Sequence, residues 1–153
     1  MRRLLPLLLL LATLGPIGCR TSQPVTVVNA RAELDDQTLW TLSSMRQKNV
    51  GPETGQPTVQ MLINLESGIA TGSTGCNRMS CHVALHDEGG ISFQDISISK
   101  MGCADEWMQF ERNFIALLRR VDGFTMDAFT LRLTQKGTTL LTFERVETDE
   151  TND

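Results

Sequence analysis

Apolar and polar residues alternate along several short stretches of the chain, a pattern typical of half-buried β-strands. The clearest example has Val59, Met61, Ile63 and Leu65 at every second position. The same pattern predicts strands at 38–42, 69–74, 79–85 and 91–98, a short strand at 25–28, and a closing hairpin of 129–133 and 141–143 with its turn at 135–137. Segment 49–57 contains two glycines and two prolines, so we predict a loop there.

A spacing of three and four residues replaces this alternation between residues 105 and 121 and predicts one helix. Acidic residues at its start and arginines at its end suit the helix dipole, and Gly123 follows as a stop signal. An aromatic ligand patch would also explain the large side chains, but a core-facing stripe is the simpler interpretation. The stripe consists of Trp107, Phe110, Phe114, Leu117, Leu118 and Val121.

Many short strands and one late helix predict an α+β fold, in which a curved, mainly antiparallel sheet packs the helix against its apolar face. The length of 153 residues suits a single domain with one hydrophobic core. We assign this domain to residues 38–145. Residues 146–153 are predicted to be an acidic, solvated tail.

Residues 1–18 do not fit this domain and are predicted to be a lipoprotein signal peptide. Arg2 and Arg3 form a basic start, and a nearly continuous apolar run follows over 4–17. This run is shorter than the roughly 20 residues that a transmembrane helix needs. It ends in Gly18-Cys19, which resembles a bacterial lipoprotein signal, whose cysteine is lipidated and becomes the mature N-terminus.

We therefore expect lipidation at Cys19, with residues 19–37 as a tether and polar lead. Pro16 is a departure, since such signals usually have Leu at that position, and ordinary cleavage with Cys19 as a spare thiol is the alternative. Arg20 follows the cysteine, and an Asp there is what retains many lipoproteins in the inner membrane. We expect an outer-membrane protein that faces the periplasm.

The charge of the chain limits its partners. The formal net charge is −4, and no basic stripe is visible, so we expect no nucleic-acid partner. The membrane is the one partner that the sequence predicts, through the N-terminal lipid. We expect a monomer without a cofactor, and the sequence does not identify a protein or small-molecule partner.

Two glycine-flanked cysteines lie on either side of the strands at 79–85 and 91–98. The first segment reads Gly72-x-x-Gly75-Cys76-Asn77, and the second is 99–103. Glycine permits backbone conformations and close approaches that a side chain would block. Asparagine tolerates a left-handed turn after glycine better than most residues do. The simplest interpretation is that the two turns are joined to each other through the sulfur atoms of their cysteines.

These segments resemble the META domain (HslJ-like) family. That family has G-x-x-G-C-N, then S/T-x-M-A-C, then E-x-x-F-x-x-x-L and a closing hairpin. The matching residues here are Gly72, Gly75, Cys76, Asn77, Ser99, Met101, Cys103, Glu111, Phe114 and Leu118. Gly102 replaces the usual Ala, and Cys81 and Val83 stand where the family commonly has a glycine and an aromatic residue.

The resemblance implies a small β-rich fold, a location in the cell envelope and no established enzymatic activity. It also implies a loose link to stress or drug tolerance and to virulence. It places Cys76 and Cys103 close together, and in an oxidising envelope they are candidates for a disulfide. A Cys76–Cys81 bridge and two buried thiols are the alternatives, and we expect Cys81 to be a free, partly buried thiol.

The remaining residues do not predict a catalytic or metal site. His82 and His86 share a strand face but lie about 13 Å apart along an extended strand, too far for one ion. No serine has a G-x-S-x-G elbow. The acids at Asp95, Asp105, Glu106 and Glu111 are explained by helix caps and solvated faces. We predict a non-catalytic envelope lipoprotein, with a periplasm-facing binding or inhibitor module as the alternative.

Overall fold

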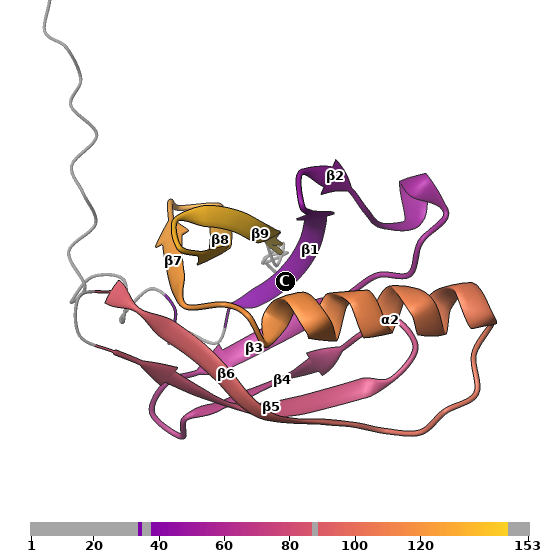
Figure 1. Ribbon diagram of the computed structural model, residues 1–153, viewed down its shortest axis with the longest axis horizontal. Coiled ribbons are helices and arrows are strands. Elements are labelled where there is room, and N and C mark those ends of the chain that lie inside the picture. The colour runs from indigo at the N-terminus through magenta and orange to yellow at the C-terminus, as the bar shows by residue number, and fades with distance from the viewer. Residues whose placement is uncertain (1–33, 35–37, 87–88, 147–153) are drawn as a thin grey trace, which may run out of the picture.

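The computed structural model describes Leu34, residues 38–86 and residues 89–146 (Figure 1). The predicted signal peptide, Cys19 and the strand at 25–28 lie outside these residues, as do nearly all of the predicted tether and tail. The described chain has one long helix and one large antiparallel sheet, which confirms the predicted α+β class.

Nine strands form the sheet, and their order in space is β6-β5-β4-β3-β1-β9-β8-β7, with β2 paired to β1 beside this path. The strands are β1 (Leu39–Met45), β2 (Lys48–Asn49), β3 (Gln60–Asn64), β4 (Ile69–Ser73), β5 (Arg78–Leu85), β6 (Ile91–Ile98), β7 (Gly123–Met126), β8 (Thr130–Gln135) and β9 (Thr138–Arg145). Helix α2 (Asp105–Leu118) connects β6 to β7, the two ends of that order.

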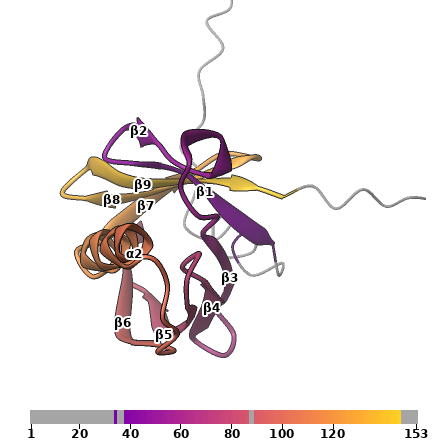
Figure 2. The same cartoon turned by 90° about the vertical axis from the view of Figure 1, so that its right-hand side faces the viewer.

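The sheet curves so strongly that its two end strands approach each other. The backbone N–H of Ile91, at the start of β6, donates to the carbonyl of Asp122, just before β7, at 3.3 Å. Figure 2 shows β1, β9, β8 and β7 as one layer, β3 to β6 as a second, and α2 along the open side between them. The helix therefore covers the interior of a partly closed sheet.

The alternation in the sequence builds this interior. Met61 and Ile63 of β3 point inward and are buried, while Leu62 between them is exposed. The rings of Phe114 on α2 and Phe143 on β9 meet edge to face, with 6.4 Å between their centroids. Their contact joins the helix to the sheet, and aromatic pairs of this geometry add to the stability gained by burial.

The helix differs from its prediction at both ends. Trp107 was placed on the core-facing stripe, but it is 40% exposed, because the buried face of α2 begins at Phe110 and its first turn contains no buried residue. The helix ends at Leu118 rather than near Val121, which is buried in the connection that follows. Gly123 does not follow as a stop signal: it begins β7, a strand that the sequence did not predict.

Two strands also depart from simple alternation. Asp95 adopts φ 50°, and the register of β5 with β6 shifts between Ser80 and His82. The resulting β-bulge shifts the alternation by one residue, so that Ile98 pairs with the buried Met79 and Ile96 packs against the core, although Ile98 itself is 40% exposed. At the closing hairpin, Phe129 precedes β8 and is exposed. The predicted loop at 49–57 contains the end of β2 and a 3₁₀ turn at Pro52–Thr54.

Candidate functional site

The turn between β4 and β5 depends on two glycines, as predicted. A Cβ on Gly72 would overlap the carbonyl oxygen of Gln60 on the neighbouring strand. Gly75 adopts φ 88°, and a Cβ there would overlap the ring of Pro57. The N–H of Gly75 also donates to the hydroxyl oxygen of Ser73 at 3.1 Å. The turn thus packs closely against β3 and the loop before it, as only glycine allows.

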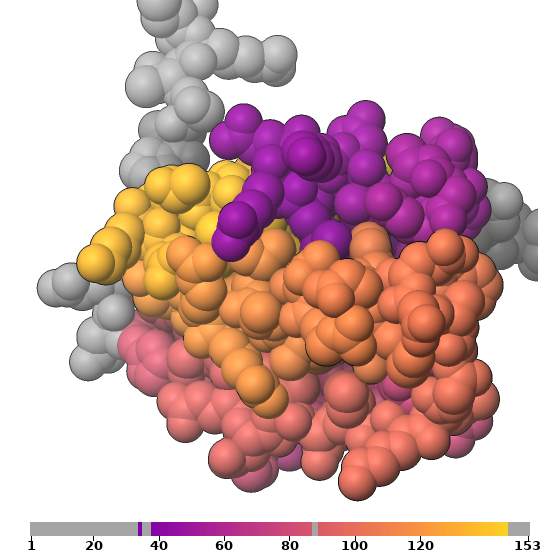
Figure 3. All heavy atoms as spheres, turned by 45° about the vertical axis from the view of Figure 1, so that its right-hand side comes forward, coloured from indigo at the N-terminus to yellow at the C-terminus, as the bar shows by residue number. Residues whose placement is uncertain are grey.

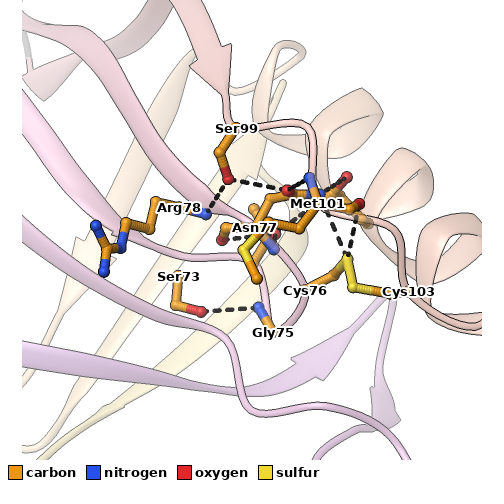
Figure 4. Close-up of a disulfide and its surroundings, with 10 residues drawn as sticks. Ser73, Gly75, Cys76, Asn77, Arg78, Ser99, Met101 and Cys103 are labelled. Carbon is orange, nitrogen blue, oxygen red and sulfur yellow. Dashed lines mark hydrogen bonds between the residues drawn. A yellow bond between two sulfur atoms is a disulfide. The ribbon is translucent and has the colours of Figure 1, made fainter.

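A disulfide joins this turn to the segment before the helix. Cys76 and Cys103 are bonded, with 6.1 Å between their Cα atoms and a sequence separation of 27. Figure 4 shows the bridge next to Asn77 and Met101, at the point where the chain leaves β6 toward α2. The structure therefore contains the predicted pairing, and the alternative Cys76–Cys81 bridge is not formed.

Asn77 is the centre of the hydrogen bonds around the bridge. Its side-chain oxygen accepts from the hydroxyl of Ser99 at 2.9 Å and from the backbone N–H of Met101 at 2.8 Å. Its amide nitrogen lies 3.1 and 3.0 Å from the two carboxylate oxygens of Glu111. One side chain thus ties the turn, the segment 99–101 and the helix together. We call Thr74, Asn77, Ser99 and Glu111 the Asn77 cluster.

Thr74 completes this cluster at the base of the turn. Its backbone N–H donates to the carbonyl of Asn77 at 2.8 Å, and its hydroxyl oxygen accepts from the N–H of Asn77 at 2.9 Å. The same hydroxyl is hydrogen-bonded to Glu111. Asn77 is not in the left-handed region that we expected for it. The hydrogen bonds of its side chain, and not its backbone conformation, therefore explain why an asparagine occupies this position.

The prediction for Glu111 is wrong, because this residue is buried. It was assigned to a solvated face, yet it is 5% exposed and accepts hydrogen bonds from Asn77. A buried carboxylate needs such donors, because burial without them is costly. The sequence did contain the signal: Glu111 precedes Phe114 by three positions and Leu118 by seven, so it lies on the buried face of the helix.

The other predicted motif residues contribute in different ways. Met101 uses its backbone N–H, while its side chain is 61% exposed. Cys81 is free, as predicted, but it is fully rather than partly buried on the inner face of β5. Burial raises the pKa of the Cys81 thiol to about 11, which leaves it protonated and unreactive near neutral pH.

The histidines and the other acids lie away from the Asn77 cluster. His82 Nδ1 is 3.1 Å from Asp95 Oδ2, and His86 Nε2 is 2.8 Å from the hydroxyl of Ser92, all on the exposed surface. Asp105 and Glu106 occupy the first turn of α2, where negative charge suits the dipole. Among the described residues, no group of three or more His, Cys, Asp or Glu could hold a metal ion.

The META domain family matches residues 32–147. The chain belongs to the META domain family. This confirms the resemblance drawn from the three sequence motifs, and the disulfide and the Asn77 cluster are built from residues of those motifs. No curated protein matches the chain.

Solved structures with a similar fold include an NMR structure of a protein from Burkholderia xenovorans. It has a TM-score of 0.62 and 25% identity, over 90% of this chain and 100% of that one. A second NMR structure has a TM-score of 0.54 and 22% identity, over 74% of this chain and 92% of the other. A crystal structure of a DUF4847 family protein from Bacteroides vulgatus has a TM-score of 0.54 and 12% identity, over 76% of this chain and 98% of the other. The last two show the fold alone.

Within the part of the chain that the structure describes, no helix has both the length and the apolar character needed to cross a membrane.

Proposed function

We propose that this META domain protein is a non-catalytic lipoprotein of the bacterial cell envelope, anchored through Cys19 and exposed to the periplasm at the outer membrane. The N-terminal sequence is the observation that carries the proposal: a basic start, an apolar run and Gly18-Cys19. Its link to stress or drug tolerance rests on the family resemblance alone.

The disulfide supports an envelope location. Disulfides persist in oxidising compartments and are rare in the cytosol. The Cys76–Cys103 bridge closes a loop that includes β5 and β6, so it contributes to the structure of the domain. Cys81 is a free thiol buried in the core, which supports a structural rather than a thiol-exchange role for the three cysteines of the domain.

The Asn77 cluster supports a non-catalytic role. Asn77 and Glu111 are both 5% exposed, and their polar atoms bond to each other and to the neighbouring backbone. A catalytic acid or base needs to reach a substrate within hydrogen-bond distance. Glu111 instead uses its oxygens to hold the turn between β4 and β5 against α2.

A binding module is the second candidate, and a cavity favours it. This cavity of about 540 Å³ lies between the outer face of β1 and β9 and the segment 49–58. Hydroxyl groups of Thr41, Ser43 and Thr142 line it, together with Glu53 and Glu144. Its volume falls in the range of small-molecule sites, and its groups suit a polar ligand that is neutral or cationic.

Metabolic labelling tests the lipid anchor directly. Cells that express the full chain are fed a fatty-acid probe, and the wild type is compared with Cys19→Ala. We expect label on the wild type and on a Cys81→Ala control, no label on Cys19→Ala, and recovery of the labelled protein with outer membranes. Equal labelling of the wild type and Cys19→Ala would refute the anchor.

The binding module has a separate test. Amino sugars are added to the full chain, and the shift in unfolding temperature is compared between the wild type and Glu144→Gln. A shift that the variant loses would support this second candidate, and no shift with any amino sugar would count against it.

A further inference from the structure

A second cavity lies between the β1–β2 hairpin and the C-terminal half of α2. Its volume is about 320 Å³, near the lower end of the range for small-molecule sites. Figure 3 shows residues of the early strands in contact with those of α2 across the surface of the molecule. The residues that line it include Met45, Arg46, Lys48, Ala116, Leu117 and Arg120.

The charge of this cavity is opposite to that of the chain. Arg46, Lys48 and Arg120 line it and no Asp or Glu does, although the formal net charge of the whole chain is −4. The ion pairs His82–Asp95 and Arg132–Asp127 involve none of these three cations. Three positive charges therefore converge on one cavity without a carboxylate partner.

The side chain of Arg120 and the backbone of Arg46 are held in place by hydrogen bonds. Arg120 donates from Nε and Nη2 to the side-chain oxygen of Gln135, at 3.1 and 2.7 Å. This neutral partner fixes the guanidinium but leaves its charge uncompensated. Arg46 and Gln47 form the turn between β1 and β2 with φ 47° and 65°, where glycine or asparagine would be easier to accommodate. The N–H of Arg46 donates to the carbonyl of Leu140 at 2.8 Å and fixes this turn.

The base of the cavity is apolar. Leu117 is buried in the core, and Met45 is half-buried and packs against it. A cationic rim above an apolar base suits a ligand with an anionic head and a short hydrocarbon segment. Arginine in particular binds phosphate and carboxylate groups through paired hydrogen bonds.

We propose that this cavity is a binding site for an anionic amphiphile. Its phosphate or carboxylate head lies among Arg46, Lys48 and Arg120, and the first carbons of its chain lie over Met45 and Leu117. The proposal does not depend on lipidation of Cys19, since the cavity is formed by the folded domain.

Binding of short probes to the full chain tests this site. The chain carries Cys19→Ala, so that no covalent lipid can compete. Hexyl phosphate and hexanoate are titrated while the amide NMR signals of 45–48 and 116–120 are followed, with hexylammonium, hexanol and inorganic phosphate as controls. We expect both six-carbon anions to shift these signals at concentrations where the three controls do not. The tighter of the two identifies the head group, and either order supports the proposal.

The variant pair is chosen so that the fold is preserved. Arg46→Asn removes one charge and suits the left-handed turn, and Lys48→Gln removes the second from an exposed position. Together they should weaken binding at least about tenfold. Arg119→Gln, which changes an exposed arginine beside Arg120 that does not line the cavity, should change it by less than about twofold.

Three results would overturn the proposal. These are unchanged binding in the folded double variant, binding of hexylammonium as tight as that of the anions, and binding of inorganic phosphate as tight as that of hexyl phosphate. The last would show an anion site that makes no use of the apolar base.

Discussion

At the scale of single residues, Asn77 shows why one amide can organise a turn. An asparagine side chain has two donor hydrogens and an oxygen with two acceptor positions. Here the donors face Glu111, and the oxygen receives Ser99 and Met101. A carboxylate in its place would lack donors for Glu111, and an apolar residue would lack both functions.

Asn77→Ala should therefore lower the free energy of unfolding by about 2–4 kcal/mol, because it leaves the buried carboxylate of Glu111 short of donors and removes the acceptor of the Met101 N–H. Urea unfolding measures this loss. Asn113→Ala is the matched control, since Asn113 is exposed on α2 and bonds only to Gln109 through its side chain. A cost for Asn77→Ala no larger than that of the control would refute the role assigned to the amide.

The raised pKa of the Cys81 thiol predicts slow alkylation in the native protein and a pH-dependent contribution to stability. Burial raises that pKa from 9.0 to about 11, so at pH 8 the native thiol should be ionised about a hundredfold less than an unfolded one. Iodoacetamide should label it slowly in the native protein and rapidly in denaturant. The unfolded thiol ionises first, so wild-type stability relative to Cys81→Ala should fall as the pH rises from 9.0 to about 11. Fast native labelling would contradict its burial.

At the scale of elements, helix α2 is anchored to the sheet by the residues in the middle of its buried face. Phe114 is fully buried against Phe143, while Trp107 lies on the exposed first turn. Phe114→Ala should cost about 3–5 kcal/mol, as for other large core side chains. Trp107→Ala should cost less than about 1 kcal/mol. Chemical denaturation of the two variants compares them, and equal costs would restore the predicted core position of Trp107.

The pairing of β3 with β4 requires a glycine at position 72, because there is no room for a side chain beside Gln60. A Cβ on Gly72 would meet the backbone of Gln60, whereas one on Gly102 would meet nothing within 4 Å. Gly72→Ala should thus destabilise the protein by at least about 2 kcal/mol, and Gly102→Ala should stay within about 0.5 kcal/mol of the wild type. Thermal unfolding measures both. A neutral Gly72→Ala would show that β3 and β4 can separate without cost.

The elements also show which parts of the fold the sequence could predict. The alternation of apolar and polar residues predicted β3, and the spacing of three and four residues between apolar side chains predicted α2, because both patterns are local in the sequence. The bulge at Asp95 and the strand β7 were missed, because a one-residue insertion breaks the period and four residues are too few to establish one. The helical spacing of Glu111 already indicated a buried position, but its partner could not be predicted, because Asn77 lies 34 positions away and only the folded chain brings them together.

At the scale of the whole molecule, α2 and the bridge occupy the two places where a curved open sheet needs support. The helix covers the open side (Figure 2), and the bridge holds the chain where it leaves β6 for the helix. Closure of a 27-residue loop is worth roughly 3–4 kcal/mol on the chain-entropy estimate. The same pair of cysteines thus stabilises the structure and supports the proposed envelope location, which the N-terminal sequence carries.

The pairing of the cysteines in the protein isolated from cells is therefore the most direct test. The non-reduced protein is digested at acid pH, to prevent exchange, and its peptides are identified by mass spectrometry. We predict one dominant linked peptide that joins Cys76 to Cys103, with Cys81 recovered as a free thiol. Free thiols at Cys76, Cys81 and Cys103, or a dominant bridge that includes Cys81, would contradict the account.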